Sequence, residues 1–154
     1  MASVWHLAKR LVTSATAAPL TVLERRQVSE VLLYAEMQLF VRFSVADQRH
    51  ALVVLRRFDV IAAEAAVAEG VAVEVRRAAL LHDIGKIEAS LGTVARVAAT
   101  LLGPRTGRFR AYHEHEARGA ALLQAAGSDA VTVALVAGQG DEPWRGLLAR
   151  ADAV

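Results

Sequence analysis

The stretch Leu80-Leu81-His82-Asp83-Ile84-Gly85-Lys86 is the most informative part of this sequence. It contains the end of a helical pattern and three side chains capable of chemistry, those of the histidine, the aspartate and the lysine. The positions before it recur at i, i+3, i+4 and i+7, which is the stripe of an amphipathic helix: Val75, Ala78, Ala79 and His82. We therefore expect His82 to point toward the core at the end of a helix, with Asp83 directly after it.

A second histidine is expected to face inward from the preceding helical stretch. The apolar stripe there runs through Val54, Phe58, Ile61 and Ala65, and His50 lies one turn before it. A buried imidazole beside a carboxylate is costly unless each group has a partner. A divalent cation is one such partner, since neutral imidazole and carboxylate both bind first-row transition metals. The alternative is a hydrogen-bonded core histidine, which is the commoner fate of a lone inward-facing histidine.

The composition of the whole chain favours one all-α domain. Its 154 residues are 55% hydrophobic and 22% charged, and 32 of them are alanine, the best helix former. Only 5% are aromatic and three are proline, which disfavours a strand-rich fold. Cysteine is absent, so disulfides, thiol catalysis and cysteine-bound zinc are excluded. The net charge of +2 is too small to indicate nucleic-acid binding.

Capping signals and glycines divide the chain into helices with short breaks. Thr21-x-x-Glu24 is a capping box and Ser44-x-x-Asp47 starts another helix, while Gly70 and Gly85 mark interruptions. The expected helices cover residues 3–13, 21–40, 44–69, 73–82, 93–102, 113–126, 128–137 and 144–153. We expect the helices within residues 1–43 to pack on a unit formed by residues 44–154, as one structural unit overall.

Targeting and membrane signals are weak. The most membrane-like window, Gly119 to Gly138, is interrupted by Gly127-Ser128-Asp129, which is typical of a helix stop followed by a new N-cap. We therefore expect two short buried helices there, with no membrane association. The Lys9-Arg10 pair lies where a signal peptide needs an apolar stretch, so a cytoplasmic location is expected.

The motif pattern resembles the HD-domain superfamily of metal-dependent phosphohydrolases, in particular small stand-alone bacterial members. That family has a histidine on one helix, a His-Asp pair that ends another, and an aspartate on a late helix. The matching residues are His50, the pair His82 and Asp83, and Asp152 within Leu147-Leu148-Ala149-Arg150-Ala151-Asp152. The resemblance implies a compact helical bundle that binds one divalent ion (Mn, Fe, Ni, Zn, Co or Mg) through these four side chains.

The resemblance also implies a reaction, the hydrolysis of a nucleotide or another small phosphate ester by a metal-activated water. Asp83 would ligate the metal and orient the attacking water, and Lys86 would meet a phosphate oxygen rather than stay a solvated charge. His115, in a His-x-x-x-Gly stretch, would contact the phosphate or protonate the leaving group. Arg49 is expected to contact phosphate because it lies beside His50, near the proposed site.

The other charged residues near His115 and in the preceding loop are given lesser roles. His113 is expected on a different helix face, with its participation left open, and Glu114 and Glu116 are expected to be surface charges. Three arginines lie in the expected loop over residues 105–110. They either recruit an anionic substrate or, the more ordinary reading, solvate the loop.

One departure from the family pattern leaves a second function open. Two-metal relatives carry histidines after a valine-rich helix, where this chain has Ala137-Gly138-Gln139-Gly140. A second metal ion is therefore not expected. The alternative function is a catalytically weak HD-like domain that binds nucleotides or regulates. The apolar N-terminal helices either pack on their own domain or build a homodimer.

Overall fold

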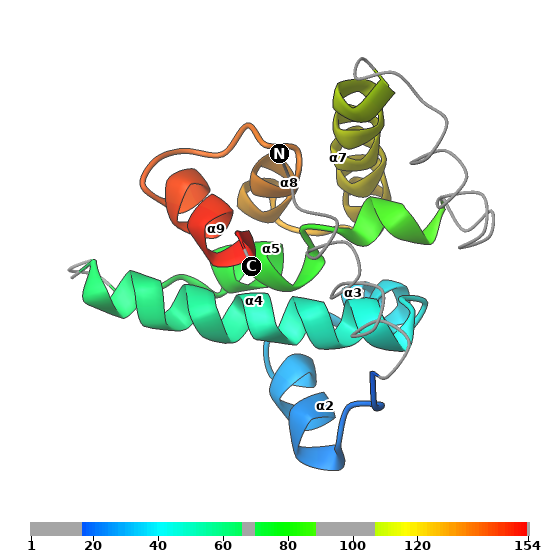
Figure 1. The fold of residues 1–154 in the computed structure, drawn as a ribbon, viewed down its shortest axis with the longest axis vertical. Helices are drawn as coiled ribbons and strands as arrows, with labels where there is room; N and C mark the ends of the chain where they lie inside the picture. The colour runs from blue at the N-terminus through cyan, green and yellow to red at the C-terminus, as the bar shows by residue number, and fades with distance from the viewer. Residues whose placement is uncertain (1–16, 66–69, 89–106, 154) are drawn as a thin grey trace, which may run out of the picture.

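The computed structural model describes residues 17–65, 70–88 and 107–153, with side chains from residue 114 onward in the last range. These residues form seven α-helices and one 3-10 helix without any strand, which confirms the all-α prediction (Figure 1). The expected helices at 3–13 and 93–102 lie outside the described residues. The elements are α2 (Val22–Ser29), α3 (Tyr34–Phe40), α4 (Val45–Glu64), α5 (Val73–Leu81), η1 (Ile84–Ile87), α7 (Gly107–Ala125), α8 (Ala130–Val136) and α9 (Trp144–Asp152).

The long helix α4 lies at the centre of the packing between the helices. Helices α5 and α9 both pack against it, α8 packs against α5, and α7 packs against α8 and η1 (Figure 1). The predicted stripe of α4 is confirmed at Val54 and Phe58, which are fully buried, and Ile61 is partly buried. Ala65 is exposed instead, because the helix ends at Glu64. Burial of a side chain such as Phe58 contributes about 1.5–3 kcal/mol.

The expectation of a single helix over residues 21–40 was wrong. The capping box of Thr21 and Glu24 forms as predicted, with Thr21 N donating to Glu24 at 2.9 Å and Glu24 N donating to Thr21 at 3.2 Å. The chain then turns after Ser29, and a second helix begins where the Glu36 carboxylate accepts a hydrogen bond from Leu33 N at 2.9 Å. Leu33 has no capping side chain of its own, so this start carried no recognisable sequence signal.

Other helix boundaries also differ from the prediction, and α4 ends at Glu64 rather than at residue 69. Helix α7 begins at Gly107 rather than near residue 113, so the end of the expected basic loop is helical. Helix α8 begins after Asp129 rather than Ser128. The break between them is as predicted, with Gly127 in the left-handed region at φ 75°. Among the described residues, none of the helices combines the length and apolar character needed to cross a membrane.

Two glycines allow α7 to approach η1 at backbone distance. A Cβ atom on Gly85 would lie 2.1 Å from the carbonyl oxygen of His115, and one on Gly119 would lie 3.2 Å from Gly85 N. A side chain at Gly85 would require the backbone of α7 to move, and one at Gly119 would require its neighbours to give by a few tenths of an ångström. The absence of a Cβ atom at both positions therefore allows α7 to place His115 close to the segment that carries Asp83 and Lys86.

The described part of the N-terminal region belongs to the same hydrophobic core as the rest. Leu20, Val28 and Phe40 are buried in one cluster with residues of α4 and α5. Arg49 of α4 also binds this region. It donates to the carbonyls of Ala18 at 2.8 Å and Pro19 at 2.9 Å, and to Glu24.

Candidate metal centre

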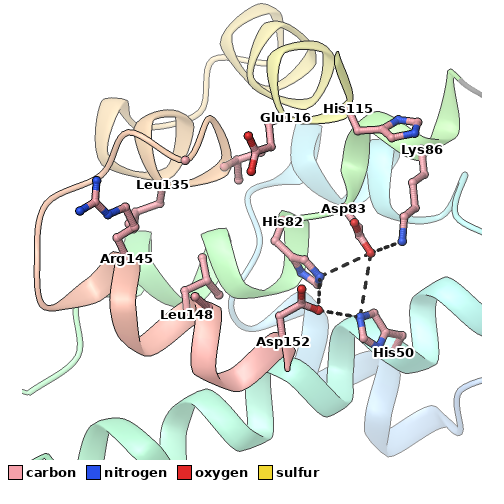
Figure 2. A pocket seen from close by; sticks show the side chains of 13 residues that line it. His50, His82, Asp83, Lys86, His115, Glu116, Leu135, Arg145, Leu148 and Asp152 are labelled. Atoms are coloured by element: carbon pink, nitrogen blue, oxygen red, sulfur yellow. Dashed lines mark hydrogen bonds and ion pairs between the residues drawn. The ribbon is translucent and has the colours of Figure 1, made fainter. Parts of the chain in front are cut away.

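Four elements meet at one polar point beside the hydrophobic core. His50 lies in the second turn of α4, His82 is the C-cap of α5, Asp83 precedes η1, and Asp152 is the last residue of α9. The packing of α5 and α9 on α4 brings these side chains together from distant parts of the sequence (Figure 2). The structure thus brings together all four side chains that the sequence suggested as metal ligands.

The distances between the four side chains are those of a compact cluster. Nε2 of His50 lies 3.1 Å from Oδ1 of Asp152 and 3.9 Å from Oδ2 of Asp83. Nε2 of His82 lies 3.2 Å from the same Asp152 oxygen and 3.5 Å from the Asp83 oxygen. One ligand atom each from His50, His82 and Asp83 fits within 4.8 Å of the others. The two imidazole rings are 5.4 Å apart between centroids.

His82 has the polarity that a metal ligand needs. Its Nδ1 lies 3.0 Å from the carbonyl oxygen of Ala79, and because a carbonyl only accepts, Nδ1 carries the proton. In the neutral ring Nε2 is then the lone-pair nitrogen, the usual arrangement of a metal-bound histidine. This buried Nε2 makes no hydrogen bond of acceptable geometry, although it faces the Asp83 and Asp152 oxygens. A lone pair facing two carboxylates requires a proton or a cation between them.

The charges of the cluster act on the pKa values in the direction expected for such a site. Burial alone would lower the pKa of His82, but the contact with Asp152 and the charge of Asp83 outweigh burial and raise it. Burial would raise the pKa of Asp83, whereas the charges of His82 and Lys86 outweigh burial and lower it. The hydrogen bond from His50, followed by the contact with His82, lowers the pKa of Asp152. Both carboxylates are therefore ionised, as ligands must be.

His50, His82 and Asp83 could together hold one divalent cation, and Asp152 lies beside both imidazoles. Two imidazole nitrogens and two ionised carboxylates form a mixed nitrogen and oxygen site, which suits several first-row metals and does not select one of them. The orphaned Nε2 of His82 is the observation that carries this fit. The carboxylates that raise its pKa would stabilise a bound cation for the same electrostatic reason.

The cluster forms one end of a cavity of about 330 Å³. Lys86 and His115 line the cavity beside it, as the sequence suggested, and the Lys86 ammonium is ion-paired with Asp83 (Figure 2). Lys86 is part-buried rather than a freely solvated helix end. The cavity volume lies at the small end of the range for ligand pockets, about 300–1,000 Å³.

The structure does not bring Arg49 to the cavity. Its guanidinium is bound to Ala18, Pro19 and Glu24 and is absent from the cavity lining. Helical geometry explains this placement, because the residue next to His50 on a helix points about 100° away from it. Arg49 anchors the N-terminal region instead of facing a phosphate.

Two charged residues of the cavity were missed by sequence reasoning. Glu116 was expected at the surface, but its side chain is half-buried and lines the cavity, whereas Glu114 is exposed as expected. Arg145 lines the cavity from α9 and is paired with Glu142 at 2.8 Å. Adjacency to His115 is no signal for Glu116, because neighbouring residues on a helix point about 100° apart. His113 and the arginines at 105, 108 and 110 lie outside the described side chains.

No protein-family model, curated protein or solved structure matches the chain.

Proposed function

We propose that this chain is a metal-dependent phosphohydrolase of the HD-domain superfamily, a cytoplasmic bacterial enzyme that hydrolyses a nucleotide or another small phosphate ester. The observation that carries the proposal is the convergence of His50, His82, Asp83 and Asp152 at the end of a cavity that also holds Lys86. The buried Nε2 of His82 supports it, because this atom makes no hydrogen bond and faces the oxygens of Asp83 and Asp152, a position that favours a cation.

The four side chains would hold one divalent cation. When bound, such a cation would polarise a phosphoryl oxygen and lower the pKa of a water molecule toward neutrality. His82 is fixed for this role, because its hydrogen bond to Ala79 sets the tautomer and the ring orientation. Asp83 would serve both as a ligand and as the group that orients the attacking water.

The remaining polar residues near the cluster would handle the phosphate. The Lys86 ammonium lies against Asp83 and would meet a non-bridging phosphate oxygen while staying in contact with that carboxylate. His115 is held over this point by the close approach of Gly85 and Gly119. It would contact the phosphate or donate a proton to the leaving-group oxygen as the bond to phosphorus breaks.

The test is metal-dependent turnover by the purified full chain. Nucleoside monophosphates and aryl phosphates are assayed with Mn, Fe, Ni, Zn, Co and Mg in turn, and released phosphate is measured. The variant Asp83→Asn removes a ligand charge and should lower turnover about a hundredfold or more. Asp59→Asn is the matched control, because Asp59 pairs with Arg76 away from the cavity, and it should stay within about twofold of wild type.

The same experiment separates the alternative function. Metal-dependent phosphate release that is lost only in Asp83→Asn supports the enzyme. Nucleotide binding without release, measured by calorimetry, supports a binding or regulatory module instead. A chain that neither releases phosphate nor binds nucleotide contradicts both.

A further inference from the structure

The cavity extends beyond the residues that the proposed reaction uses. One end holds the metal cluster with Lys86 and His115. The other end is formed by apolar side chains of α8 and α9, by the turn after α8, and by two charged side chains: Leu135, Val136, Leu148, Gly138, Glu116 and Arg145 (Figure 2). A phosphate bound beside Lys86 would leave this second end for the alcohol to which the phosphate is attached.

Glu116 enters the cavity from α7 while its neighbour on the same helix turns to solvent. The Glu114 side chain is 60% exposed and pairs with Arg118 at 3.5 Å, but Glu116 is half-buried. In Figure 2 the Glu116 side chain projects from α7 between the position of Lys86 and that of Arg145. The Glu116 carboxylate and the proposed proton donor His115 therefore line the same cavity.

The turn after α8 is shaped around the Glu116 carboxylate. A Cβ atom on Gly138 would lie 3.3 Å and 3.4 Å from the two Glu116 oxygens, closer than most real contacts. Gly138 is also in the left-handed region at φ 70°, where glycine is favoured. The carbonyl end of α8, which carries partial negative charge, lies at the same turn. This corner of the cavity thus favours a ligand group that donates hydrogen bonds.

The walls beside Glu116 limit what can carry that donor. Leu135, Val136 and Leu148 are almost fully buried and present apolar surface to the cavity. Arg145 is half-exposed and held by Glu142 at 2.8 Å. With a volume of about 330 Å³, the cavity has room for one small monoester rather than an extended ligand.

We propose that Glu116 determines substrate specificity by accepting hydrogen bonds from hydroxyl groups on the alcohol part of the ester, so that the substrate class is hydroxyl-bearing phosphomonoesters such as sugar monophosphates. The inference rests on the proposed phosphohydrolase function and deepens it. An ionised carboxylate has several acceptor positions and can accept from a hydroxyl pair. A site built to bind hydroxyls discriminates strongly against analogues that lack them.

The experiment compares two esters across three variants of the full chain with the metal that supports turnover. Ribose 5-phosphate carries hydroxyls on its alcohol part and phenyl phosphate carries none, and the ratio of their kcat/KM values is measured. Differences in leaving-group reactivity cancel when this ratio is compared between variants. Glu116→Ala should lower the ratio about tenfold or more, mainly through the KM of ribose 5-phosphate. Glu116→Gln should recover part of that loss, and Glu114→Ala, the exposed control, should leave the ratio unchanged.

Each other outcome overturns the inference in a recognisable way. Hydrolysis of both esters with a ratio that Glu116→Ala does not change contradicts the specificity role and leaves the proposed function standing. Equal loss of both esters in Glu116→Ala also contradicts it, because the residue then acts on the shared phosphate or on folding. Failure of the wild type to hydrolyse either ester overturns the proposed function and the inference with it.

Discussion

Two part-buried charged clusters in the described part of the chain have opposite designs. The candidate metal centre combines two imidazoles with two carboxylates at the end of a cavity. The second cluster, called here the Arg77 cluster, consists of Glu36, Arg77 and Asp129 and joins α3, α5 and the start of α8. Arg77 donates to Val31 O at 3.0 Å and to Asp129 at 2.5 Å, and it lies 3.6 Å from the fully buried Glu36 carboxylate.

The two clusters differ in the basic side chains that face their carboxylates. The guanidinium of Arg77 is always protonated and has no lone pair, so the Arg77 cluster can only neutralise its carboxylates and hold helices together. The imidazoles of the metal centre can lose their protons and offer lone pairs. Similar carboxylates therefore stabilise the fold in one cluster and are available to a ligand in the other.

Removal of the permanent cation should have the largest effect on stability. Arg77→Met leaves Glu36 buried without a compensating charge, which should cost about 3–5 kcal/mol in the free energy of unfolding. Urea denaturation monitored by circular dichroism measures the loss. The neighbouring Arg76→Met is the control, because Arg76 pairs with the part-exposed Asp59 and its loss should cost less than about 1 kcal/mol. Equal costs in the two variants would contradict the structural role given to the Arg77 cluster.

Removal of a lone-pair ligand should instead abolish stabilisation by metal. At a free Mn²⁺ concentration of about a hundred times Kd, the wild type should gain about 2.7 kcal/mol in the free energy of unfolding. His82→Ala should lose this gain, because it removes the buried Nε2 that faces both carboxylates. Denaturation with and without metal measures the gain. Arg77→Met should retain it, and a full gain in His82→Ala would refute the ligand assignment.

A side chain added at the contact between η1 and α7 should have an intermediate effect on stability. This contact also positions His115 at the cavity. A methyl group on Gly85 would lie 2.1 Å from the His115 carbonyl, so Gly85→Ala should cost about 1–3 kcal/mol through displaced backbone. Thermal denaturation measures the cost. Gly70→Ala is the comparison that measures backbone strain without a steric clash, since position 70 has open space but a φ of 73°. A Gly85→Ala variant as stable as wild type would show that α7 does not lie this close to η1.

The smallest expected effect concerns a third charged group, formed by Glu24 and Arg49, which holds the N-terminal region. The hydrogen bond from Thr21 N, followed by the bond from Arg49, lowers the pKa of Glu24 from 4.5 to about 2. Its contribution to stability is therefore complete above pH 4.5 and is lost as the pH falls toward 2. Glu24→Gln should destabilise the protein at neutral pH and reduce the decline over that acid range, measured by urea denaturation at several pH values. A difference between variant and wild type that does not change with pH would contradict this origin.

The sequence predicted the parts of this picture that depend on local periodicity. The inward positions of His50 and His82 follow from apolar stripes, and the break at Gly127 follows from its neighbours. The split near Leu33 was not predictable, because the buried Glu36 that starts the new helix is stabilised by Arg77 from far along the chain. Glu116 and Arg145 were missed for a related reason, since only tertiary packing of α7 and α9 determines which of their charges face the cavity.

The most direct test of the metal centre is a crystal structure of the full chain grown with Mn²⁺, with anomalous diffraction recorded to locate the ion. We expect one strong anomalous peak bounded by His50, His82, Asp83 and Asp152, within coordination distance of their nitrogen and oxygen atoms. The absence of a peak at this point, with Nε2 of His82 instead hydrogen-bonded to a carboxylate, would contradict the assignment of these four residues as metal ligands.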